Sequence, residues 1–123
     1  MKFKTLMTLK AVVCLGFGPL LLFFPAQLLN LLGLMVCSGA LLTAREYGAS
    51  MMGNLLLTWL ARNAENSATR RAIVWDLFIY DAVGLVVTLS VQLSGGLNLL
   101  GWGIMFVYLF FTVGFGYFLL PRK

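Results

Sequence analysis

Residues 99–120 have the sequence LLGWGIMFVYLFFTVGFGYFLL and contain no acidic or basic side chain. Crossing about 30 Å of hydrocarbon takes roughly 20 helical residues, so this stretch is long enough to span a lipid bilayer. Pro121, Arg122 and Lys123 follow it with a helix breaker and two positive charges. The run therefore predicts a transmembrane helix.

Three more apolar stretches predict transmembrane helices, over residues 6–24, 39–61 and 72–93. The connector over 25–38 is too short for a further span and favours a short interfacial helix. Ser94, Gly95 and Gly96 predict a tight turn before the last helix. We therefore expect an all-α fold, an integral membrane four-helix bundle that forms a single domain over residues 1–123.

Composition favours lipid as the surrounding medium. The chain is 61% hydrophobic and only 11% charged, whereas soluble domains carry about 45–50% apolar and roughly 25% charged residues. A body of 123 residues leaves much of its surface exposed, so it cannot hide this excess of apolar side chains from water.

The basic residues predict the orientation in the membrane. In a four-span arrangement eight of them fall on one side, and the connectors on the other side carry no charge. The positive-inside rule then places both termini and the loop over 62–71 in the cytoplasm. The net charge of +5 indicates anionic lipid headgroups of the cytoplasmic leaflet as partners, and nucleic acid is not expected. The eight residues are Lys2, Lys4, Lys10, Arg62, Arg70, Arg71, Arg122 and Lys123.

Residue types that carry most catalytic and metal chemistry are scarce. The chain has no histidine, which removes the usual haem ligand and the commonest zinc ligand. Cys14 lies inside an apolar run and Cys37 at the edge of another, so both are expected as free thiols. We therefore predict no catalytic residues, no metal and no cofactor.

Five charged residues fall inside the predicted spans, where a charge at the bilayer centre costs at least ~2.5–3.5 kcal/mol. Lys10 and Asp76 lie at similar depths near the cytoplasmic edge, and they predict a structural ion pair. In the alternative, Lys10 extends to the interface and Asp76 meets an arginine of the basic loop. Arg45 and Glu46 lie near the external end of the second span, and Asp81 lies near the middle of the third, within reach of the long Arg45 side chain.

Polar residues also form a stripe on each of the two inner spans. Glu46, Ser50, Asn54 and Thr58 recur at every fourth position of the second span. On the third span, the stripe consists of Asp81, Gly84, Thr88 and Gln92, with Tyr80 beside it. Such stripes predict burial between helices, where they either hold the bundle together by hydrogen bonds or line a path for protons or small solutes. The candidate polar site comprises Arg45, Glu46, Ser50, Asn54, Tyr80 and Asp81.

A short repeat leaves two interpretations open. The sequence LNLLG occurs at 29–33 and again at 97–101, each time at the predicted external end of a helical hairpin. It indicates either an internal duplication of a two-helix unit or a coincidence in a chain rich in leucine and glycine.

The second span and the loop after it carry a resemblance. Arg45-Glu46-Tyr47-Gly48-Ala49, then Gly53, then Trp59-Leu60-Ala61-Arg62, is similar to a pattern in small bacterial four-helix membrane proteins of unknown function. These families resemble the DoxX-like proteins in architecture. The resemblance implies a four-helix bundle in a prokaryotic inner membrane and implies no activity.

Two functions are consistent with these features. The first is a non-enzymatic membrane protein, an accessory, scaffold or self-associating subunit of a membrane complex. The second is a small-solute or proton-linked transporter that uses Arg45, Glu46 and Asp81.

Overall fold

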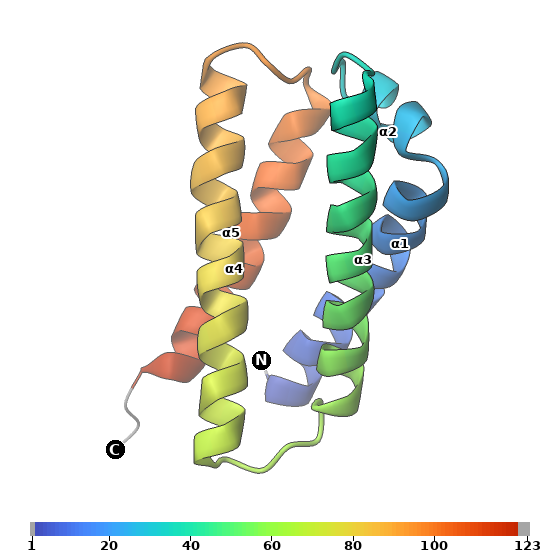
Figure 1. Cartoon of the computed structure of the whole chain (residues 1–123). Coiled ribbons are helices and arrows are strands. Elements are labelled where there is room, and N and C mark those ends of the chain that lie inside the picture. The colour runs from blue at the N-terminus through green and yellow to red at the C-terminus, as the bar shows by residue number, and fades with distance from the viewer. Residues whose placement is uncertain (1, 121–123) are drawn as a thin grey trace. The chain divides into compact units, whose positions relative to one another are not determined.

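The computed structural model describes residues 2–120, and every regular element in this range is a helix. The helices are α1 (Phe3–Phe23), α2 (Pro25–Leu31), α3 (Ser38–Leu60), α4 (Ala68–Leu93) and α5 (Leu100–Leu119) (Figure 1). The predicted all-α fold is confirmed.

Local sequence explains where several helices begin and end. The Ser67 hydroxyl accepts a hydrogen bond from the backbone N–H of Arg70 at 3.2 Å, which caps α4. Pro25 opens α2 at a position where its missing N–H has no helical acceptor to lose. Gly33 and Gly95 follow α2 and α4 with φ angles of 79° and 81°, a left-handed conformation that favours glycine.

The four long helices match the four predicted segments closely. The largest difference is at α4, which begins at Ala68 instead of residue 72. The helix starts at its cap, Ser67, so its first turn includes polar residues that do not belong to the apolar run. The short α2 fills the first half of the 25–38 connector, as expected there, and its interfacial position stays a prediction.

Three helices, α1, α4 and α5, are long and apolar enough to cross a membrane by length and composition. The sequence predicted four such segments, and within residues 2–120 three helices are long and apolar enough. The exception is α3, because Arg45, Glu46 and Asn54 interrupt its apolar residues.

The two LNLLG copies differ in structure. The first copy ends α2, with Gly33 at positive φ, and the second leads into α5, with Gly101 inside that helix. They therefore lack the common structure that a duplicated hairpin predicts.

The chain divides into two compact units. The N-terminal unit is Met7–Arg62, and the C-terminal unit combines Met1–Leu6 with Asn63–Lys123. The first turn of α1 belongs to the C-terminal unit, and the rest of that helix belongs to the N-terminal unit.

In the N-terminal unit, α1 and α3 are antiparallel and approach closely at glycines. A Cβ atom on Gly48 would lie 3.0 Å from the carbonyl oxygen of Gly18 and 3.0 Å from Cβ of Leu21. Farther along α3, Met52 contacts Gly18. Beside these contacts lies a buried apolar cluster formed by Cys14, Leu21, Ala44 and Met51.

In the C-terminal unit, α4 and α5 are antiparallel, and aromatic rings lie on glycines. The Tyr108 ring lies against Gly84, and the Phe78 ring lies against Gly116. The first turn of α1 packs at the end of α5, where the Phe3 and Phe118 rings meet edge to face with centroids 5.5 Å apart. The most buried aromatic side chains of the whole chain, Phe111 and Phe115, also come from α5.

Candidate functional site

Asp81 is fully buried near the middle of α4, on the predicted polar stripe. Three residues later, Gly84 lies against the Tyr108 ring of α5. At the far end of the stripe, the Gln92 side-chain amide donates a hydrogen bond to the Asn98 carbonyl oxygen, just before α5, at 3.2 Å. Two members of the predicted stripe, Gly84 and Gln92, therefore contact α5 or the residues that lead into it.

Tyr108 was not among the predicted site residues. A Cβ atom on Gly84 would overlap Cε1 of Tyr108 and would lie 2.7 Å from Cζ, so only glycine leaves room for this ring. The sequence held one signal, which is that Gly84 is the only small residue in a stripe of otherwise larger polar side chains. What it did not reveal is which side chain fills the space.

The stripe on α3 is only partly buried. Thr58 is fully buried, and its hydroxyl donates to the carbonyl oxygens of Asn54 and Leu55 in its own helix. Asn54 is half-buried, whereas Glu46 and Ser50 are exposed. The expectation that this whole stripe is buried is wrong at Glu46 and Ser50.

Glu46 and Ser50 are exposed because a different face of α3 packs against α1. Ala44, Gly48 and Met51 turn toward α1 and are buried. At about 100° per residue, Ala49 and Gly53 lie on the opposite side of α3, where both are exposed. A Cβ atom on Gly53 would meet no atom within 4 Å.

We call this exposed side the open face of α3. It consists of Leu42, Arg45, Glu46, Ala49, Gly53 and Leu60, all of which are exposed. The predicted site residues Arg45 and Glu46 are thus exposed on their unit, while Asp81, which belongs to the other unit, is fully buried.

Two predicted contacts would connect the two units. Lys10 belongs to the N-terminal unit and is only 2% exposed, a burial that lysine almost never shows without a partner. Asp76 belongs to the C-terminal unit and is exposed. The Lys10–Asp76 ion pair and the reach of Arg45 toward Asp81 both stay predictions. Tyr80 is half-buried, and its place in one site with the α3 residues also stays a prediction.

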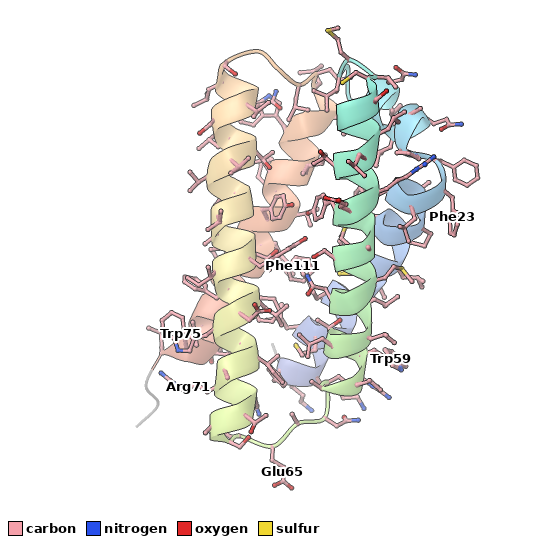
Figure 2. The ribbon with its side chains drawn as sticks, viewed as in Figure 1. Phe23, Trp59, Glu65, Arg71, Trp75 and Phe111 are labelled. Atoms are coloured by element: carbon pink, nitrogen blue, oxygen red, sulfur yellow. The ribbon has the colours of Figure 1, made fainter. Side chains whose placement is uncertain are left out.

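A basic cluster occupies one end of the C-terminal unit. The Arg70 guanidinium lies 3.8 Å from the centroid of the Phe3 ring, a cation–π contact between α4 and the first turn of α1. Arg71 donates from Nη2 to the Leu119 carbonyl oxygen at 3.2 Å, which satisfies one of the last carbonyls of α5. Figure 2 shows Arg71 near the start of α4, with Trp75 one turn farther along.

A second basic–aromatic contact lies at the end of α3 in the N-terminal unit. The Arg62 guanidinium lies 3.8 Å from the centroid of the Trp59 ring. Trp59, labelled in Figure 2, is 47% exposed, and Trp75 in the other unit is 46% exposed. Half-exposed tryptophans beside arginines are typical of helix ends at a membrane interface.

The described residues hold no group of three or more histidine, cysteine or carboxylate side chains placed to bind a metal ion. Neither Cys14 nor Cys37 forms a disulfide bond. The side-chain hydrogen bond that joins α4 to the start of α5 runs from Gln92 to Asn98. In comparisons with known proteins, the chain matches no protein-family model, no curated protein and no solved structure.

Proposed function

We propose that this chain is a four-span integral membrane protein, although α3 is less apolar than the other long helices. Support comes from the contact between the starts of α1 and α4, where Arg70 lies over the Phe3 ring. Two apolar helices that begin beside each other enter the bilayer from the same side. The chain must then cross back between them, and α3 is the long helix that connects them.

The packing of α3 supports the same topology. From Gly18 to Leu22 of α1, the neighbouring helix is α3, in backbone contact at Gly48. A helix that lies this close along a membrane span shares its layer of the bilayer. Irregular or polar segments are tolerated at that depth where protein covers them.

The positive-inside bias gives the proposed orientation. Lys4, Arg70 and Arg71 lie in the first turns of α1 and α4, and Lys2 directly precedes α1, at the same end at which Arg70 meets Phe3. Anionic headgroups attract such residues by about 1 kcal/mol each. We therefore place both termini and the loop after α3 in the cytoplasm, in an inner membrane, as the likeness to DoxX-like architecture also implies.

Thiol labelling tests this topology with a residue that the chain already has. Native Cys37 is exposed before α3 and is expected to react with a membrane-impermeant maleimide added outside intact cells. Asn66→Cys, in a Cys37→Ala background, is expected to react only after the cells are permeabilised. Labelling of both positions from the same side would show that α3 does not cross, and the four-span topology would be wrong.

Within the membrane, we propose that the protein works as a non-enzymatic subunit of a membrane complex. The observation that carries this proposal is the open face of α3, which presents Arg45 and Glu46 about 10–12 Å from the start of the helix by its rise of 1.5 Å per residue. A charge that faces lipid at the bilayer centre costs ~2.5–3.5 kcal/mol. Covering by another protein chain removes the charges from lipid and provides partners for them.

Native electrophoresis of mildly solubilised membranes tests the subunit proposal. The intact protein is expected to migrate in a complex larger than one chain. Replacing both charges, Arg45→Leu with Glu46→Leu, is expected to release the single chain. Val83→Ala on α4, which changes an exposed apolar residue, is the matched control and should leave the complex intact. A wild-type protein that migrates as one chain would contradict the proposal.

A proton-linked carrier is the second candidate, and the full burial of Asp81 favours it. Ionisable groups inside a membrane segment mark proton and solute pathways in many transporters. If Asp81 serves such a path, Asp81→Asn abolishes pH-driven uptake in reconstituted vesicles and leaves folding intact. Asp76→Asn, at an exposed carboxylate on the same helix, is the control and should keep the flux.

A further inference from the structure

We propose that the open face of α3 docks on the same face of a second copy of this chain, in a pair related by a two-fold axis along the membrane normal. This inference rests on the proposed function, because it names the partner of the proposed membrane subunit. Its basis is the arrangement of two opposite charges around a strip of small residues.

The positions of these residues on the helix are set by about 100° of rotation per residue. Ala49 and Gly53 lie along the middle of the open face. Arg45 falls on one side of this middle line and Glu46 on the other. The two side chains therefore diverge, and within one chain they make a poor pair for each other.

A two-fold axis brings opposite charges together. Copies inserted by the same rule share one orientation in the bilayer, so two α3 helices meet in parallel and equal residues lie at equal depth. The axis turns one helix by half a revolution, which places Arg45 beside Glu46 of the partner subunit. The reverse contact forms on the other side, as an isologous interface requires. Arg45 and Glu46 differ in depth by only about 1.5 Å, one helical rise.

Small residues allow the backbones to come close enough for these pairs. Ala49 and Gly53 are four residues apart, which is the small-xxx-small spacing of packed membrane helices. Gly53 has open space where its Cβ would be, so a neighbouring helix can approach there. Leu42 and Leu60, which are 61% and 75% exposed, extend the contact along the same line.

The charges favour a second copy over an unrelated chain. The open face holds one positive and one negative group, and it is complementary to itself under the two-fold rotation. An unrelated partner would need its own pair of charges at the same depth and in the opposite arrangement. A like-charge juxtaposition at such an interface costs several kcal/mol, so the open face disfavours a partner chain that lacks this arrangement of charges.

Cysteine cross-linking in native membranes tests the contact directly. In a Cys37→Ala background, Ala49→Cys lies on the middle line, where the two-fold axis brings it beside its own copy. Mild oxidation is expected to convert most of this variant into a disulfide-linked dimer. Val12→Cys, at a 58% exposed position of α1, is the matched control and should stay monomeric. Equal cross-linking of the two variants would overturn the proposal.

Charge reversal tests the pairing itself. Arg45→Glu places four carboxylates at the interface, and it is expected to lower the dimer association constant at least about tenfold, a minimum for like-charge contacts. The double change Arg45→Glu with Glu46→Arg restores opposite charges across the axis and is expected to restore dimerisation. The cross-linking yield of Ala49→Cys is measured in each background. A double variant no better than the single one would contradict reciprocal pairing.

The outcomes separate this inference from the proposal beneath it. If Ala49→Cys does not cross-link, but Arg45→Leu with Glu46→Leu still releases a single chain from a complex, then α3 binds a different protein. In that case the self-association is wrong and the subunit proposal stands. If the wild-type protein is a single chain in native membranes, both are wrong.

Discussion

The two units pack their antiparallel helices in different ways. In the N-terminal unit, Gly48 brings the backbones of α1 and α3 together, with the Gly18 carbonyl in contact. In the C-terminal unit, Gly84 makes room for the aromatic ring of Tyr108. Lipid is as apolar as leucine, so membrane helices associate through close packing and hydrogen bonds. The comparison shows that glycine serves this packing either by close backbone contact or by accommodating a large side chain.

The units also differ in where their charges lie. Asp81 in the C-terminal unit is fully buried, whereas Arg45 and Glu46 in the N-terminal unit are exposed. A buried polar group favours a fixed arrangement within one chain. The exposed charged pair is the feature on which the proposed contact with another chain rests.

The largest expected effect is at the backbone contact. Gly48→Leu inserts a side chain where even a Cβ atom would lie 3.0 Å from a backbone oxygen, so the helices must separate. We expect a loss of about 3 kcal/mol in the free energy of unfolding, at the upper end of ordinary overpacking, measured by denaturant titration in detergent micelles. Gly53→Leu on the open face is the matched control, with a change in stability of the single chain below about 0.5 kcal/mol. Equal losses would show that α1 and α3 do not meet at Gly48.

An intermediate effect is expected at the ring contact. Gly84→Ala makes the new methyl group overlap the Tyr108 ring, and we expect a loss of about 1–2 kcal/mol. Unlike the backbone contact, this one can be relieved by shortening the partner. Gly84→Ala added to Tyr108→Ala should therefore cost little more than Tyr108→Ala alone, a coupling that a double-mutant cycle measures. Simple additivity would contradict the contact.

The smallest effect is expected where the neighbour is flexible. A Cβ atom on Gly114 would lie 2.9 Å from Cδ1 of Leu6, the mobile end of a side chain. Leu6 can turn aside, so Gly114→Ala should change the free energy of unfolding by less than about 0.5 kcal/mol. A loss as large as that of Gly84→Ala would show that Leu6 is held rigidly.

Much of the helical fold follows from the sequence, because an apolar run long enough to cross a bilayer has few alternatives to a helix. The four long helices were predicted with small errors at their ends. The start of α4 was missed since Ser67 caps a first turn that contains Arg70 and Arg71, residues that hydropathy alone assigns to a loop. Within residues 2–120, α3 falls short of the other three in apolar character because it carries two adjacent charges.

The candidate site was harder to predict because periodicity identifies faces of a helix and not what covers them. In α3, Ala44 and Gly48 form one small-residue face, and Ala49 and Gly53 form another. Either could have received α1, and the sequence does not decide between them. The first face packs on α1, so Glu46 and Ser50 are exposed instead of buried. The burial of Asp81 was foreseen, and the contact of Tyr108 with Gly84 was not.

The contact of Phe3 with Phe118 and Arg70 has a consequence for biosynthesis. Phe118 is synthesised 115 residues after Phe3. The start of α1 therefore lacks its final neighbours until α5 has been made. During that interval the Phe3 ring and the adjacent lysines are accessible to the insertion machinery and to lipid headgroups. The contact of Phe3 with Phe118 forms only after α5 has been made.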